Sequence, residues 1–249
     1  MQLLAAIGGL SFVAVSFLVG LRLVLLARRT RELPEFAIGT ALALMGGVSY
    51  PLTAIARLAP SLSDDVRFAL FLISLLLSWI GTVLLALFNM RVFRPEEAWA
   101  RVLVAALAIA MVASFALQSF SPGLRVATFR NEGLGLRLFM GELAIPLAWG
   151  TYESLRYWEL LRKRVRLGLA DPVVADRMRL WGIAEFAACV INVSTTVAAL
   201  FGIDFAVASV GAFVIAPLGT LAAVSTWFAF IPPAAYLRRV VSRAAASEA

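Results

Sequence analysis

The stretch "APLGTLAAVSTWFAF", Ala216 to Phe230, contains no charged residue and lies within the last long apolar run of the chain. Similar runs recur from the N-terminus onward. A helix of about 20 apolar residues crosses the roughly 30 Å hydrocarbon layer of a bilayer. Because a helix satisfies its own backbone polar groups in lipid, it is the spanning structure that we expect here. The recurring runs therefore predict a helical protein that crosses a membrane several times.

The composition points to the same class. Of the 249 residues, 62% are hydrophobic and 15% are charged, whereas an ordinary soluble domain has about 25% charged residues. No stretch is left over for a separate soluble domain. We expect an all-α membrane protein, a seven-transmembrane-helix bundle that forms a single domain over residues 1–249. The seven predicted spans cover about 3–27, 35–59, 64–91, 96–119, 135–160, 177–201 and 205–237.

Several of these spans begin with residues that stabilise the start of a helix. Ser63 precedes two aspartates, Asp171 precedes a proline, and Asp204 precedes the last span. Each of the three is expected to cap the helix that follows it. Pro95 is expected at the first helical position of the fourth span, followed there by two glutamates. Acidic residues in the first turn suit the positive end of the helix dipole.

Basic residues are distributed unevenly between the two sides of this bundle. One side carries Arg28, Arg29, Arg31, Arg91, Arg94, Arg101, Arg156, Arg162, Lys163, Arg164, Arg166, Arg177, Arg179, Arg238, Arg239 and Arg243. The other side carries only Arg57, Arg67, Arg125, Arg130 and Arg137. Because basic connections stay in the cytoplasm, we expect the N-terminus outside and the C-terminus in the cytoplasm. Membrane insertion accounts for the net charge of +7, so no nucleic-acid partner is expected.

The residue usage also suggests a source and a membrane. Arginine is used almost exclusively in place of lysine, and alanine and leucine are abundant. This usage fits a bacterium with a GC-rich genome. We therefore expect a multi-pass protein of the bacterial inner (cytoplasmic) membrane.

In helix count and orientation, the predicted architecture resembles that of rhodopsins and of seven-helix receptors. A rhodopsin holds retinal on a lysine of its last helix, but the only lysine of this chain is Lys163, between the fifth and sixth spans. The third span ends in "LFNMRVF" (residues 87–93), and not in the Asp-Arg-Tyr motif of animal receptors. The resemblance therefore assigns no functional residue, and a retinal-binding pump is excluded.

Missing residue types remove other mechanisms. The chain has no histidine, and its single cysteine, Cys189, lies in the middle of the sixth span. The usual zinc, haem and Ser-His sites are therefore not expected. We expect no metal site, no cofactor and no catalytic residue. The alternative is an intramembrane enzyme that works with Glu, Tyr, Ser and Arg alone, which is a less common arrangement for acid–base chemistry.

Two carboxyl groups at membrane depth share one face of the fifth span. Glu142 and Glu153 are three helical turns apart, and Trp149 lies between them on the same stripe. Ionisable residues inside a membrane are costly and are candidate functional sites. Glu142 has no evident basic partner in sequence. We expect it to carry a proton near neutral pH and to donate a hydrogen bond to a ligand.

Three more polar residues lie within predicted spans. Glu185 and Asn192 share one face of the sixth span, and Arg22 lies in the first. For each there is a structural alternative. Arg22 is able to extend its side chain to the cytoplasmic headgroups. Glu185, like Glu153, is able to pair with Arg156 or Arg179 as a structural contact.

Tryptophans indicate where a ligand site would lie. Trp79, Trp149 and Trp227 are near the middle of the third, fifth and seventh spans, where an indole N–H needs an internal partner. With Ser78 and Thr226 they are expected to wall an apolar pocket with a few polar contacts, the usual form of a small-molecule site. Glu142 is its predicted key polar group. The alternative is ordinary aromatic packing between helices.

The connection between the fifth and sixth spans is strongly basic. The fifth span is expected to continue as helix to about Leu167, and the sixth begins near Pro172. The two helices would then project from the membrane as a hairpin. The basic residues at its tip, which we expect to contact anionic lipid or a cytoplasmic protein, are Arg162, Lys163, Arg164 and Arg166.

Three function classes fit these observations. A receptor-like or sensor-like protein with an intrabundle pocket for a small, mostly apolar ligand accounts for the topology, the tryptophans and the hairpin. A small-solute or proton-coupled transporter accounts for Glu142, Glu153 and Glu185, but the chain shows no internal repeat. If the protein is a scaffold or accessory membrane subunit, packing between helices explains every one of these features. We favour the first.

Overall fold

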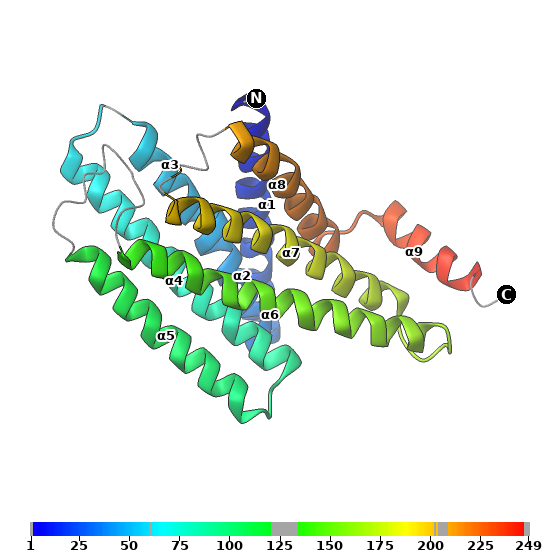
Figure 1. The fold of residues 1–249 in the computed structure, drawn as a ribbon. Coiled ribbons are helices and arrows are strands. Elements are labelled where there is room, and N and C mark those ends of the chain that lie inside the picture. Colours follow the sequence, from blue (N-terminus) through cyan, green and yellow to red (C-terminus); the bar gives the residue numbers. More distant parts are fainter. Residues whose placement is uncertain (1, 60, 121–133, 202, 204–208, 247–249) are drawn as a thin grey trace.

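A computed structural model of the chain describes residues 2–59, 61–120, 134–201, 203 and 209–246. Within these ranges the regular structure is entirely helical (Figure 1). The elements are α1 Gln2–Thr30, α2 Leu33–Leu42, η1 Ala43–Ser49, α3 Tyr50–Leu58, α4 Asp64–Phe93, α5 Ala98–Ser119, α6 Leu134–Val165, α7 Pro172–Leu200, α8 Ser209–Phe230 and α9 Ala234–Ala246.

Six stretches of this structure are long and apolar enough to cross a membrane: Gly8–Thr30, Leu33–Leu58, Asp64–Phe93, Ala98–Ser119, Pro172–Leu200 and Phe213–Phe230. They suggest a multi-pass membrane protein, as predicted. The second of them is the continuous helix made by α2, η1 and α3. The predicted fifth span is α6, which is as long as the others but is less apolar, because charged and polar residues recur along it.

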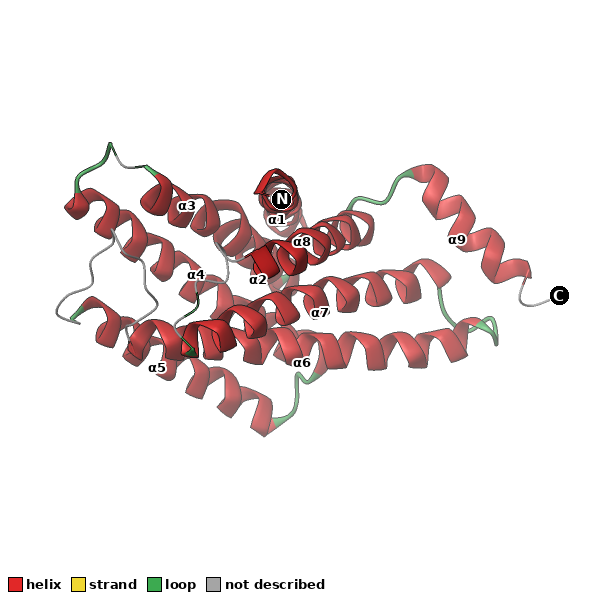
Figure 2. Ribbon diagram, turned by 45° about the horizontal axis from the view of Figure 1, so that its top comes forward, coloured by secondary structure: helices red, strands yellow, loops and turns green. Residues whose placement is uncertain are grey.

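The long helices close into a ring. α1 contacts α2 and α8, α2 contacts α4, α4 contacts α6, α6 contacts α7, and α7 contacts α8. α5 lies outside this ring, against α4 and α6 (Figure 2). One apolar core joins Val19, Leu85 and Leu147 in the centre of the ring, with Trp181 at its edge. A second core, around Met111, joins α4, α5 and α6.

Two of the predicted helix caps are confirmed, and one helix start was wrong. Ser63 accepts a hydrogen bond from the Val66 amide at 3.4 Å, and Asp171 accepts one from the Val173 amide at 2.8 Å. The fourth span does not begin at Pro95. Its helix, α5, begins at Ala98, and Pro95 lies in the turn that follows α4. The predicted cap Asp204 lies outside the described residues.

The last span is shorter than predicted. Residues 205–237 were expected to form one helix, but α8 ends at Phe230 and a separate helix, α9, begins at Ala234. Two consecutive prolines, Pro232 and Pro233, explain the break. A proline has no amide to donate, and it disfavours helical backbone in the residue before it. α9 leaves the line of α8 and lies beside the ring (Figures 1 and 2).

The second span contains a π-helical segment. In η1 the hydrogen bonds reach one residue further than in an α-helix, so the Tyr50 amide donates to the Met45 carbonyl. Pro51 follows directly and interrupts the regular ladder, which is a common cause of such a bulge. The wider turn contains Gly46, where an added Cβ would lie 2.4 Å from the Ser16 hydroxyl oxygen on α1. The segment therefore packs closely on α1.

Gly20 of α1 and Gly39 of α2 lie at a second close contact between these two spans, and this contact is open to test. An added Cβ at Gly20 would lie 2.7 Å from both the Ala43 nitrogen and the Gly39 carbonyl oxygen, which are backbone atoms that have little room to move. We expect Gly20→Ala to lower the free energy of unfolding by about 1–3 kcal/mol through overpacking. The matched control is Gly141→Ala on α6, where nothing lies within 4 Å of the added Cβ. It should raise stability by about 0.5–1 kcal/mol. Equilibrium unfolding in mixed micelles compares the two variants, and equal effects would contradict the packing described.

Candidate functional site

Glu142 faces α5. The Ser114 hydroxyl of α5 donates a hydrogen bond to Glu142 Oε1 at 2.7 Å. The sequence suggested no partner for this carboxyl group, and the pocket predicted from the tryptophans of the third, fifth and seventh spans did not include α5. The second oxygen, Oε2, is buried and has no hydrogen-bond partner among the described residues. Only one of the two carboxyl oxygens of Glu142 therefore has a hydrogen-bond partner among the described residues, and this bond lies at the contact between α5 and α6.

The same face of α6 meets α5 above and below Glu142. Towards the start of α6, the Leu136 amide donates to the side-chain carbonyl of Gln118 at 2.9 Å. Towards its end, the Trp149 ring packs against Trp99, with ring centroids 5.5 Å apart. The predicted stripe on α6 therefore exists, but it forms a polar and aromatic contact with α5.

Glu153 is held by an arginine from another helix. Its oxygens lie 2.7 Å from Arg94 Nε and 3.3 Å from Arg94 Nη2, and its side chain is 7% exposed. The hydrogen bond to Glu153 raises the pKa of Arg94, so the guanidinium remains charged. The predicted partners were wrong, because Arg156 is exposed and Arg179 pairs with Asp176. Arg94 ends α4, so the pair links the end of α4 to α6.

Glu185 occupies the tightest contact between α6 and α7. It is 2% exposed, and its Oε1 lies where a side chain at Gly150 would go, since an added Cβ there would be 2.0 Å away. The Ser154 hydroxyl donates to Oε2 at 3.3 Å. Oε1 has no hydrogen-bond partner, and Glu185 forms no ion pair, within the described part of the chain. This is a buried carboxyl group without a compensating cation.

Buried polar groups from α4 lie next to this contact. Asn89, which is fully buried, donates from Nδ2 to the Pro146 carbonyl of α6 at 2.9 Å. Pro146 is one helical turn before Gly150. The Asn89 side-chain oxygen and the Trp181 indole nitrogen are buried without a hydrogen-bond partner in the described ranges. α6 therefore meets α4, α5 and α7 through polar groups.

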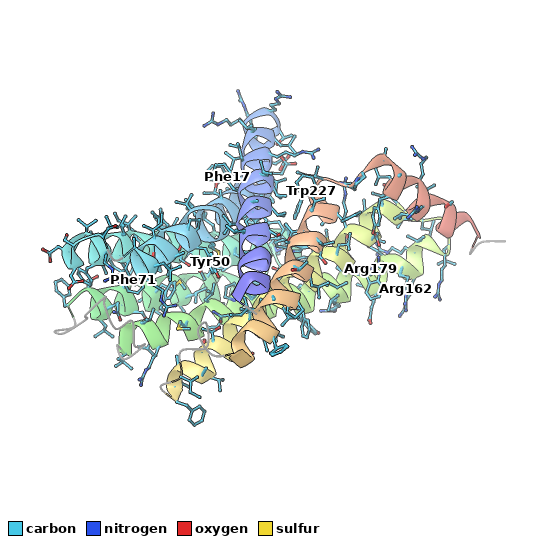
Figure 3. The ribbon with its side chains drawn as sticks, turned by 90° about the horizontal axis from the view of Figure 1, so that it is seen from above. Phe17, Tyr50, Phe71, Arg162, Arg179 and Trp227 are labelled. Atoms are coloured by element: carbon cyan, nitrogen blue, oxygen red, sulfur yellow. The ribbon has the colours of Figure 1, made fainter. Side chains whose placement is uncertain are left out.

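The three tryptophans predicted to wall one pocket lie in different environments. Trp149 packs against Trp99. Trp79 packs beside the core of α4, α5 and α6. The backbone carbonyl of its neighbour Ser78 accepts a hydrogen bond from the Thr82 hydroxyl. Trp227 lies near the end of α8 that leads to α9 (Figure 3), and its neighbour Thr226 is buried.

The remaining two predicted site residues also lie apart from each other. Asn192 has a buried side-chain oxygen without a hydrogen-bond partner among the described residues. Arg22 is exposed on α1, which agrees with the alternative that it extends to the headgroups. Neither residue joins Glu142 in a common site.

An open groove lies on the outer side of α6 and α7. Its volume is about 840 Å³, and it is open to the surroundings of the bundle, since Tyr152 is 60% exposed and Phe186 is 52% exposed. It is lined by Ala148, Thr151, Tyr152, Leu155, Arg156, Glu159, Phe186, Cys189, Val190, Val193 and Ser194. Sequence reasoning missed it. The available signal was the spacing of these residues along one side of each of the two helices.

A smaller groove of about 230 Å³ lies beside the Arg94–Glu153 pair. Arg156 lines both grooves. Trp79, Glu142 and Trp227 line neither of them. Of these two grooves, the larger one, on the outer face of α6 and α7, has room for a small molecule.

α6 and α7 continue together beyond this groove. As predicted, α6 extends to Val165, and α7 returns from Pro172. Arg162 stacks over the Trp158 ring at 5.2 Å (Arg162 is labelled in Figure 3). Exposed at this tip are Arg162, Lys163, Arg164 and Arg166, with Leu167 and Leu169.

No family model, curated protein or solved structure matches this chain. Among the described residues, no three His, Cys, Asp or Glu side chains come together in a group that would hold a metal ion. We therefore infer the function of the protein from the geometry of its described residues alone.

The Arg94–Glu153 pair has a testable energetic role. Removing the guanidinium alone leaves a buried carboxylate without its partner, so we expect Arg94→Met to cost about 3–5 kcal/mol of unfolding free energy. Arg94→Met with Glu153→Gln should recover most of that loss. The exposed Arg156→Met is the control, expected within about 0.5 kcal/mol of the parent. Unfolding in micelles measures all three variants. If Arg94→Met and Arg156→Met are equally stable, the pair does not hold α4 to α6.

Proposed function

We propose that this chain is a seven-span integral membrane protein with a receptor-like or sensor-like function, in which α6 is the span additional to the six apolar ones. The pairing of its carboxyl groups supports this: Glu142 meets Ser114 and Glu153 meets Arg94, both inside the bundle. The exposed side of α6 is apolar where it would meet lipid, at Leu138 and Ile145. Polar groups are tolerated in a spanning helix when they face protein.

We propose that the N-terminus is outside and that the hairpin tip is in the cytoplasm. Seven spans that alternate in direction place the ends of α1, α4, α6 and α8 on one side. The arginines that follow these helices, including Arg28, Arg94 and Arg239, then share that side, as the positive-inside rule requires. A bacterial inner membrane fits the residue usage.

The ligand site that we propose is the outer groove of α6 and α7, in place of the intrabundle pocket. Its volume of about 840 Å³ lies within the roughly 300–1,000 Å³ of small-molecule sites. Ala148, Leu155, Phe186, Val190 and Val193 supply apolar lining. The polar groups are the hydroxyls of Thr151 and Ser194 and, at one end, the charged side chains of Arg156 and Glu159. These properties suit a small, mostly apolar ligand that arrives from the lipid.

The hairpin supplies an output for such a sensor. α6 and α7 pack closely, since an added Cβ at Gly182 would lie 2.8 Å from the side-chain atom Cδ2 of Leu155. A ligand seated in the groove between the two helices changes their separation, and a helix pair this tightly packed transmits the change to its tip. The basic tip is the proposed contact for anionic lipid or a cytoplasmic protein.

A second function, proton-coupled transport, has one observation in its favour. Glu185 is buried without an ion-pair partner in the described ranges, beside the buried amide of Asn89. Such groups form proton relays in carriers. The observation that favours the sensor is the groove, because it is open and is continuous with the basic hairpin. A scaffold or accessory subunit predicts no bound molecule at all.

Native mass spectrometry of the purified protein, with groove variants, tests the sensor proposal. The parent should carry a bound small molecule, and Val190→Trp, which fills the groove, should remove it. Val197→Trp is the matched control, because Val197 is on the same helix, is 46% exposed and lies outside the groove. This control should retain the molecule. A parent without any bound molecule, or equal occupancy in both variants, contradicts the proposal.

A further inference from the structure

α9 has the pattern of a helix that lies at a membrane surface. Apolar residues recur at Leu237 and Val241, one turn apart, and basic or polar residues at Arg238 and Ser242, also one turn apart. A helix with one apolar and one basic side binds in the plane of a membrane interface. α9 is too short to cross a bilayer, since its bounds are Ala234–Ala246 and a span needs about 20 residues.

One side of α9 is fixed to the start of α7. The Tyr236 hydroxyl donates a hydrogen bond to Asp176 of α7, and Asp176 also pairs with Arg179 at 2.5 Å. The Tyr236 ring packs against Phe228 of α8, with centroids 4.8 Å apart. Burial, and then the bond to Asp176, raise the pKa of Tyr236, so the hydroxyl stays protonated as a donor. We call this contact the Tyr236 anchor.

Several side chains of α9 are exposed beyond this anchor. Val241 is 50% exposed, and Arg238 and Arg239 are exposed as well. α9 contacts α7 more than any other helix, and it makes this contact with the side that carries Tyr236. An apolar side chain and two cations are therefore exposed on α9, next to the end of the bundle that carries the basic hairpin (Figure 3).

We propose that α9 is an interfacial helix that docks on the anionic lipid surface at the basic side of the bundle. Val241 and Leu237 enter the boundary between headgroups and acyl chains, and Arg238 and Arg239 bind the lipid phosphates. Charge complementarity selects this occupant, because a surface with two adjacent arginines beside an apolar residue matches anionic lipid. A protein partner would need to complement the same cations with carboxylates.

Through the Tyr236 anchor, docking of α9 on lipid would also act on α7. Asp176 lies in the second turn of α7, close to the hairpin tip. A docked α9 ties the start of α7 to the bilayer surface, so lipid charge and the position of the hairpin become coupled. This inference uses no feature of the α6–α7 groove and stands whether or not the groove binds a ligand.

Depth-dependent fluorescence quenching tests the proposal in nanodiscs. In a Cys189→Ser background, bimane is attached at Val241→Cys or, for comparison at a position about 100° further around α9, at Ser242→Cys. With brominated phosphatidylglycerol in the disc, the first label should be quenched by the acyl chains and shielded from aqueous iodide. The second label should be quenched less by the acyl chains and should be more accessible to iodide.

Lipid charge is then varied with the same labels. Phosphatidylcholine discs should weaken docking, and so should Arg238→Gln with Arg239→Gln, which lowers the docking equilibrium constant by about 30-fold. Equal access of iodide to both labels would overturn the proposal, as would quenching that ignores lipid charge. Protection of Val241→Cys from both quenchers would also overturn it, because a protein would then cover this face.

Discussion

The contact between the Glu185 carboxyl group and the backbone of Gly150 holds α6 and α7 so close that no side chain at residue 150 would fit between them. Much of the molecule depends on this contact. It places Ser154 within reach of Glu185, and the open groove runs along the same helix pair. A glycine at residue 150 is the condition for this contact.

α6 is also the helix that most needs its neighbours. Glu142 is paired by Ser114 of α5, Glu153 by Arg94 at the end of α4, and the Pro146 carbonyl accepts a bond from Asn89 of α4. Each contact turns a polar group of α6 away from the outside of the bundle. A helix with these residues is costly in lipid by itself and acceptable as part of the ring. The sensor that we propose uses the one side of α6 that carries none of these pairs.

Local features of this fold were predictable from sequence, and contacts between distant residues were not. The apolar runs and the caps at Ser63 and Asp171 depend on neighbours within a few residues, so their signals are short-range. The partner of Glu153 is 59 residues away in sequence, and nearer arginines were equally plausible. The helix face that carries Glu142 was evident, but the helix that it meets depends on packing. The break after Phe230 was predictable from Pro232 and Pro233, and the apolar run hid it.

The central claim is that α6 crosses the bilayer with Glu142 and Glu153 turned inward. Nitroxide labels on its exposed side, at Leu138, Ile145, Tyr152, Leu160 and, just beyond the helix, Leu167, test this most directly in nanodiscs of the Cys189→Ser protein. Oxygen partitions into the bilayer centre, and a water-soluble nickel complex is excluded from it. The account predicts maximal oxygen access at Ile145 and nickel access that rises towards Leu167. Nickel access that is uniformly high along α6 would show a helix outside the bilayer and would contradict the account.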